Sequence, residues 1–210
     1  MSQPEPAFNM FGNKLGRVLS CYLLLVLFGS ILLDQVSKWE TQKKLLIHES
    51  KEDINNYRGT SFPIGTLGDR HTDGVPFYIG LKFQYARNTG AAFSMFSDWP
   101  DAVRVPFFYG VTIVAMVMIV FLLRGLPYNQ HCTRVGLVFI AAGAIGNFLD
   151  RLQYGYVVDF IDVDWNFFGW RHDFAIFNVA DISINIGIYL YIIDFFITYR
   201  REKRQKLASA

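Results

Sequence analysis

Four long apolar runs constrain this chain more than any other feature of its sequence. They are Val18–Leu33, Val105–Leu123, Val135–Leu149 and Ile182–Ile193, and none contains a charged residue. A helix that crosses a membrane needs about 20 mostly apolar residues. Charged residues make up 18% of the chain, below the roughly 25% of an average soluble domain. The runs therefore predict a membrane protein and not a soluble protein with a large apolar core.

We predict a mainly α-helical membrane protein with four transmembrane helices, forming a single integral membrane domain over residues 1–210. With their flanking residues, the predicted spans are about 18–38, 105–123, 135–152 and 178–199. Small residues in the third run, such as Gly136 and Gly143, would let its helix pack closely against a neighbour. A net charge of +2 is too close to neutral to indicate binding to nucleic acid.

The first run follows Lys14 and Arg17, a basic flank that also precedes the core of a secretory signal peptide. We interpret the run as a span because it is at the upper limit of the roughly 7–15 residues of such a core, and no small-residue cleavage pattern follows. Asp34 and Lys38 come next, four positions apart, and can pair on one helix face. A salt bridge at the membrane boundary and a role at a functional site are equally good interpretations of this pair.

Basic residues indicate the orientation of the spans. Lys14 and Arg17, the short loop Arg124–Arg134 and the tail Arg200–Lys206 fall on one side of a four-span protein. Because cytoplasmic segments carry an excess of lysine and arginine, we expect both termini in the cytoplasm. The acid-rich segment 150–177 is then expected outside.

Two segments outside the runs have the pattern of strands and predict a small extracytoplasmic β-platform. In the first, about 78–93, apolar residues such as Leu81 and Phe83 alternate with more polar ones. The second, about 156–174, is rich in valine, isoleucine and aromatic residues. The polar interval 39–77 has no assigned function, and its first part could extend the first helix into water.

The segment between the third and fourth runs concentrates the candidate chemistry. Asp159 follows the third run and Asp181 opens the fourth span, and ionisable groups at the edge of hydrocarbon are functional candidates by default. Two carboxylates held close together share one proton, so that one is an acid and the other a base at neutral pH. Such a pair can activate water against an amide bond and protonate the leaving nitrogen. Polar residues at other outer ends of spans are expected nearby: Asp34, Lys38, Asn147, Arg151 and Asn178.

Three other kinds of site compete with this interpretation. A calcium or magnesium site could use the oxygen ligands of Asp159, Asp162, Asp164 and Asp173. We disfavour it, because Asp162 and Asp164 alternate along a strand and are expected to face solvent or lipid head groups. A transporter is disfavoured because no inverted repeat is present. Both cysteines, Cys21 and Cys132, are expected to be free thiols, and Cys21 has no activating neighbour for nucleophilic catalysis. We expect neither a metal nor another cofactor.

Five short motifs resemble those of the bacterial lipoprotein signal peptidases, the signal peptidase II family, and occur in that family's order. They are Asp34-Gln35-Val36-Ser37-Lys38, Asn88-Thr89-Gly90-Ala91-Ala92-Phe93, Gly146-Asn147-Phe148-Leu149-Asp150-Arg151, Val157-Val158-Asp159-Phe160 and Phe177-Asn178-Val179-Ala180-Asp181. Ser37 stands where the family usually has threonine, and the interval 39–80 is longer than is usual for the family.

The resemblance implies an aspartic endopeptidase of the bacterial cytoplasmic (inner) membrane, with its active site near the extracytoplasmic face. It would remove signal peptides from prolipoproteins by cleaving before a diacylglyceryl-modified cysteine, among membrane lipids, and globomycin-type cyclic peptides would inhibit it. By motif position, Asp159 and Asp181 resemble the catalytic pair. The residues that would bind substrate are Asn88, Gly90, Asn147, Arg151 and Asn178. The residues that would support the site are Asp34, Lys38 and Asp150.

Overall fold

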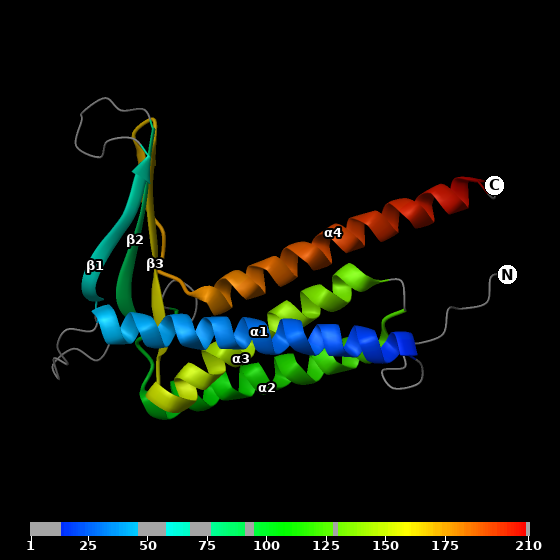
Figure 1. The fold of residues 1–210 in the computed structure, drawn as a ribbon, viewed down its shortest axis with the longest axis horizontal. Coiled ribbons are helices and arrows are strands. Elements are labelled where there is room, and N and C mark those ends of the chain that lie inside the picture. The colour runs from blue at the N-terminus through cyan, green and yellow to red at the C-terminus, as the bar shows by residue number, and fades with distance from the viewer. Residues whose placement is uncertain (1–13, 46–57, 68–76, 91–94, 128–129, 209–210) are drawn as a thin grey trace. The chain divides into compact units, whose positions relative to one another are not determined.

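The computed structural model of the chain describes residues 14–45, 58–67, 77–90, 95–127 and 130–208 (Figure 1). The helices within these ranges are α1 (Lys14–Leu45), α2 (Asp101–Gly125), α3 (His131–Tyr154) and α4 (Val179–Ala208). The strands are β1 (Arg58–Leu67), β2 (Phe77–Asn88), β3 (Val157–Phe167) and β4 (Trp170–Asp173). All four helices are long and apolar enough to cross a membrane, which confirms the predicted multi-pass, mainly helical architecture.

Two helices run beyond the predicted spans. α1 continues past residue 38 to Leu45, and α4 continues past residue 199 to Ala208. Both extensions are rich in lysine, arginine, glutamate and glutamine, which are good helix formers and tolerate water. The predicted extension of the first helix is therefore confirmed as far as Leu45, and residues 46–57 lie outside the described part of the chain.

The connection between α2 and α3 is shorter than the predicted loop, because α3 begins at His131. Thr133 in the first turn of α3 donates from its backbone N and from Oγ1 to Oδ2 of Asp194, at 3.1 and 2.5 Å. This carboxylate of α4 satisfies a backbone N–H that the start of a helix leaves unpaired. Cys132, expected in the loop, lies in α3 instead, and it and Cys21 are free thiols as predicted.

The strands form one antiparallel sheet in the order β1-β2-β3-β4. β2 and β3 fall within the two segments with strand-like patterns, so the predicted β-platform exists. β2 ends at Asn88, and Ala91-Ala92-Phe93 at the end of the first predicted segment lie outside the described residues. A two-residue turn, Phe168-Gly169, joins β3 to β4, and both residues have positive φ (51° and 89°), as tight hairpins require.

β1 is the strand that the sequence analysis missed. It lies in the polar interval 39–77 and pairs with β2. Pro63 and Gly65 interrupt its pattern, and the pairing register shifts between these two residues. Proline is confined to edges and bulges of sheets because it has no N–H to donate. An edge strand with a bulge has no simple alternation, and the period-2 signal is lost.

The expectation that Asp162 and Asp164 face solvent or lipid head groups is wrong, since each is only 5% exposed. Lys82 lies opposite Asp162 in the β2–β3 register, with Nζ 3.1 Å from Oδ2. Asp164 lies over Gly80 of β2, where a β-carbon would collide with its carboxylate. A cross-strand cation and the space above a glycine therefore permit these acids to be buried. The side chain of Asp173 is outside those described.

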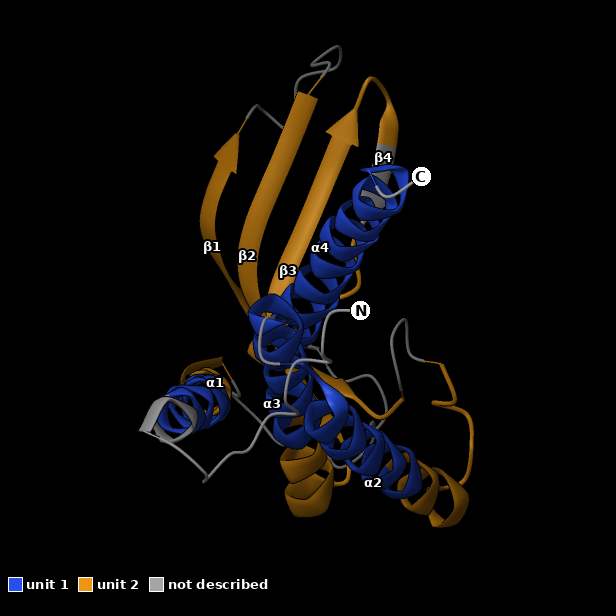
Figure 2. Cartoon of the chain, turned by 90° about the vertical axis from the view of Figure 1, so that its right-hand side faces the viewer, with its two compact units in different colours: residues 1–33, 109–146, 180–210 blue, residues 34–108, 147–179 orange. Residues whose placement is uncertain are grey.

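The chain divides into two compact units (Figure 2). The helical unit comprises residues 1–33, 109–146 and 180–210, and the sheet unit comprises residues 34–108 and 147–179. All four helices contribute residues to both units, and the single domain stays a prediction. Within the helical unit, α3 and α4 pack closely at Gly136 and Gly187, where a β-carbon on either glycine would collide with the backbone carbonyl of the other. The predicted role of small residues in the third run is confirmed there.

Candidate active site

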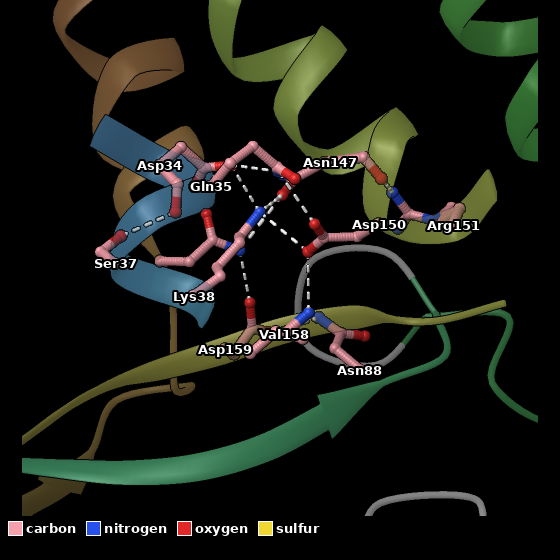
Figure 3. Close-up of polar contacts among 11 residues, drawn as sticks. Asp34, Gln35, Ser37, Lys38, Asn88, Asn147, Asp150, Arg151, Val158 and Asp159 are labelled. Carbon is pink, nitrogen blue, oxygen red and sulfur yellow. Dashed lines mark hydrogen bonds and ion pairs between the residues drawn. The ribbon is translucent and has the colours of Figure 1, made fainter. Parts of the chain in front are cut away.

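Polar side chains from α1, α3, β2 and β3 gather in the sheet unit (Figure 3). Asn178, in the segment before α4, joins them through hydrogen bonds to Asn147 and Asp159. The least exposed of these polar side chains, each at most 3% exposed, are Asp34, Lys38, Asp150, Asp159 and Asn178. Gln35, Asn88, Asn147 and Arg151 complete this polar cluster. Buried charges and amides are tolerated when hydrogen bonds and ion pairs hold them, and each member of the cluster makes at least one of the contacts below.

Lys38 is the centre of the charged part of the cluster. Its Nζ lies 2.8 Å from Oδ2 of Asp34 and 2.9 Å from Oδ2 of Asp150, and it donates to Oδ1 of Asn147 at 3.0 Å. An ammonium group has three N–H donors, and these three acceptors use all of them. The predicted pairing of Asp34 with Lys38 is confirmed, and Lys38 also joins α1 to α3.

Asp150 connects α3 to the strand that carries Asp159. Its Oδ1 accepts a hydrogen bond from Nε2 of Gln35 at 3.0 Å, and its Oδ2 accepts one from the backbone N–H of Val158 at 3.0 Å. Val158 precedes Asp159 in β3, so this bond fixes the strand backbone beside the candidate catalytic carboxylate. No role was predicted for Gln35, although its spacing of three from Lys38 places both on one helix face.

Neutral amides hold Asp159. Its Oδ2 accepts from Nδ2 of Asn88 at 2.9 Å, and its Oδ1 accepts from Nδ2 of Asn178 at 2.6 Å. Asn178 also donates to Oδ1 of Asn147 at 3.1 Å, the same oxygen that accepts from Lys38. The carboxylate is thus oriented through both oxygens and connected through two asparagines to the charged part of the cluster.

Arg151 connects α3 to the residues that follow β2 through hydrogen bonds. Its Nη2 donates to the backbone oxygen of Gly90 at 2.7 Å, and its Nη1 donates to the backbone oxygen of Asn147 at 3.2 Å. The guanidinium lies 4.3 Å from the ring centre of Phe108, a cation–π contact. Gly90 in turn donates its N–H to the side chain of Asn88 at 3.0 Å. Arg151 therefore positions the turn that carries Asn88.

A second polar group of the sheet unit went unnoticed in the sequence. The hydroxyls of Tyr85 and Tyr156 lie 3.2 Å apart, and Nε of Arg87 donates to the Tyr85 hydroxyl at 3.3 Å. Burial, with the hydrogen bond to Tyr85 as a smaller cause, raises the pKa of Tyr156 above its usual value. The phenol therefore stays neutral at physiological pH. Alternation along β2 places Tyr85 and Arg87 on one face, which is the signal that could have joined them.

Eight of the ten predicted site residues thus belong to the polar cluster, and a ninth, Gly90, contacts it through its backbone N–H and oxygen. The tenth, Asp181, lies in the first turn of α4 in the helical unit, and its backbone oxygen accepts from Nδ2 of Asn185 at 2.9 Å. It follows Asn178 by three residues. In the described part of the chain, no three His, Cys, Asp or Glu side chains converge as metal ligands would.

Comparison with known proteins identifies relatives of this chain. A family model described as signal peptidase (SPase) II matches residues 26–197. A protein named lipoprotein signal peptidase from Geobacter sulfurreducens is 34% identical over 182 residues, which cover 86% of this chain and 92% of the relative. Another protein of that name, from Enterococcus faecalis, is also 34% identical over 182 residues, covering 84% of this chain and 90% of the relative.

Solved structures agree with the sequence comparisons. One, described as a bacterial membrane enzyme determined by the in meso method at 2.3 Å resolution, superposes with a TM-score of 0.59 at 31% identity. The match covers 84% of this chain and 88% of that one. A second bacterial membrane enzyme, at 1.9 Å resolution, gives a TM-score of 0.56 at 32% identity, and the match covers 83% of this chain and 92% of that one.

Proposed function

Because this chain belongs to the signal peptidase II family, a family of membrane peptidases that process the signal peptides of lipoproteins, we propose a specific reaction for it. It is an aspartic endopeptidase that cleaves diacylglyceryl-modified prolipoproteins just before the lipidated cysteine. Asp159 and Asp181 are its catalytic pair. The metal-site and transporter alternatives are not favoured by its relatives.

The single observation that carries this proposal is the way Asp159 is held. Its two oxygens accept hydrogen bonds from the neutral amides of Asn88 and Asn178, at 2.9 and 2.6 Å. Amide donors orient a carboxylate, whereas an adjacent cation would also make it a weaker base. Asp150, in contrast, is bound to Lys38, which suits a supporting role. We therefore assign proton exchange to Asp159, whose two oxygens are both oriented by amide donors.

The spacing along the sequence supports Asp181 as the second carboxylate of the pair. Asp181 follows by three residues the asparagine that contacts Asp159, and three residues of chain span at most about 11 Å. Asp181 also lies in the first turn of α4, where the helix dipole favours a negative charge. Two carboxylates that share a proton supply the base and the acid together.

In the proposed reaction, the ionised carboxylate takes a proton from a water molecule whose oxygen attacks the scissile carbonyl carbon. The protonated carboxyl donates to the carbonyl oxygen, which becomes a hydroxyl of the tetrahedral intermediate. The carbon–nitrogen bond then breaks as the amide nitrogen receives the proton taken from water and the hydroxyl returns its proton. A new carboxylic acid and a free amine result, and the pair regains its shared proton.

The other residues of the cluster position the substrate and the pair. Asn88, Gly90, Asn147, Arg151 and Asn178 are the proposed substrate-binding group, and Asp34, Lys38 and Asp150 support it. The basic end of α4 supports an orientation with both termini in the cytoplasm and the sheet outside. The active site then faces the outer side of the inner membrane, where a lipid-anchored peptide presents its scissile bond. Globomycin-type cyclic peptides would compete with this peptide for the active site.

The test uses purified enzyme and one prolipoprotein prepared with and without its diacylglyceryl group. Mass spectrometry of the products should show one cut, immediately before the modified cysteine. The unlipidated precursor should be cleaved at least about a hundredfold more slowly, because the acyl chains hold the bond at the site. Equal rates for the two precursors, or a cut elsewhere, would refute this substrate assignment.

A further inference from the structure

A cavity of about 300 Å³ lies in the helical unit, apart from the polar cluster described above. The end of α2, the start of α3 and the C-terminal half of α4 form its walls. Three leucines, Leu122, Leu126 and Leu137, and aromatic side chains of α4 provide its apolar surface. Two carboxylates, those of Asp194 and Glu202, also line it. A cavity of this size and mixed lining can hold the head group of a small amphiphile.

Asp194 is unusual because it is 9% exposed within an otherwise apolar part of α4. Both of its hydrogen bonds, from the N and Oγ1 of Thr133, go to the same oxygen, Oδ2. Among the described residues no donor contacts Oδ1, although the residue lines the cavity. A carboxylate at membrane depth is costly without a partner of opposite charge, so Oδ1 offers a place for a cation.

The charges around the cavity indicate which cation fits. None of the residues that line it is basic, so no side chain there neutralises Asp194 and Glu202. Just beyond the cavity, the exposed end of α4 carries Arg200, Arg201 and Lys203. A ligand with an ammonium group and a neighbouring phosphate would match the acidic cavity with one group and the basic helix end with the other.

We propose that this cavity binds the head group of an aminophospholipid, the zwitterionic lipid class that carries a primary ammonium group. The ammonium donates to Oδ1 of Asp194, and the adjoining chain lies against the leucines. The membrane supplies this lipid, and charge-assisted hydrogen bonds distinguish it from lipids without the amine. The site is separate from the proposed peptidase residues and does not depend on their assignment.

The test is a titration of the purified full-length protein in detergent, followed by native mass spectrometry. Phosphatidylethanolamine should bind one to one, and phosphatidylglycerol with the same chains should bind at least about tenfold more weakly. Asp194→Asn keeps an oxygen for Thr133 but removes the charge, and it should weaken phosphatidylethanolamine binding about tenfold or more. Asp98→Asn removes an equal charge from an exposed position outside the cavity and should leave binding unchanged.

A second variant keeps the test decisive if Asp194→Asn fails to fold. Thr198 also lines the cavity, and Thr198→Phe fills the space while both carboxylates remain. It should abolish one-to-one binding of phosphatidylethanolamine and leave peptidase activity intact. Equal binding of the two lipids, or phosphatidylethanolamine binding that survives either variant in folded protein, would overturn the proposal.

Discussion

Replacing Lys38 by methionine should strongly destabilise this protein, because its ammonium group is buried between two carboxylates. The side chain of Lys38 is 3% exposed and those of Asp34 and Asp150 are 1% exposed. Methionine has a similar length but no charge, so two buried carboxylates would face each other without their cation. Breaking a buried ion pair by removing one partner typically costs about 3–5 kcal/mol. We expect a loss of folding free energy in that range, together with loss of peptidase activity.

The chain contains a matched control for this experiment. Lys44 and Glu40 form an ion pair of the same spacing along α1 and the same 2.8 Å separation, but their side chains are 71% and 37% exposed. Water already solvates both groups, so Lys44→Met should leave stability unchanged within error. The difference between the two variants therefore isolates the effect of burial from that of pairing.

The assay is reversible unfolding of the purified protein in mixed micelles, followed by circular dichroism at constant detergent composition. A third variant, Lys38→Met with Asp34→Asn and Asp150→Asn, removes the stranded charges and should recover most of the lost stability. If Lys38→Met is as mild as Lys44→Met, or if the triple variant is no more stable than Lys38→Met, the electrostatic account of the cluster is wrong.

Three further variants test other contacts. Arg151→Lys keeps the charge but loses the guanidinium fork that donates to the backbone oxygens of Gly90 and Asn147, so substrate cleavage should fall about tenfold at normal protein levels. The control is Arg104→Lys, at a buried arginine that donates to the backbone oxygens of Ser97 and Trp99, and it should not affect cleavage. Normal cleavage by Arg151→Lys would limit Arg151 to a structural role. Gly136→Ala should destabilise the protein by about 1–3 kcal/mol in the same unfolding assay, because its β-carbon collides with the Gly187 backbone, whereas Gly110→Ala, with open space around it, should not. Because burial raises the pKa of Tyr156, the neutral phenol stabilises the fold below the unfolded-state pKa of about 10, and this stabilisation is lost as the pH rises further. Between pH 8 and 11, the free energy of unfolding should therefore fall more steeply in wild type than in Tyr156→Phe. Identical slopes would contradict this.

Much of this architecture could be predicted because its causes are local. Charge-free runs predict the spans, and a spacing of four residues predicts the Asp34–Lys38 pair. The bonds from Lys38 to Asn147 and from Gln35 to Asp150 join positions 109 and 115 residues apart, and no local pattern encodes them. β1 was missed because Pro63 and Gly65 erase its alternation. The burial of Asp162 was missed because its partner Lys82 lies on another strand, in a register that only the folded sheet reveals.

The catalytic pair was predicted from motif position, and its test is the central measurement for this protein. Purified wild type, Asp159→Asn and Asp181→Asn should be assayed on one lipidated prolipoprotein, with Asp98→Asn as an exposed control and with a chelator added to a parallel wild-type sample. Asparagine keeps the size of each side chain and removes its acid–base function. Both pair variants should fold and insert normally yet lose all detectable cleavage, while the control and the chelated enzyme retain full activity. Cleavage at the wild-type rate by either pair variant, or its loss on chelation, would contradict the assignment of Asp159 and Asp181.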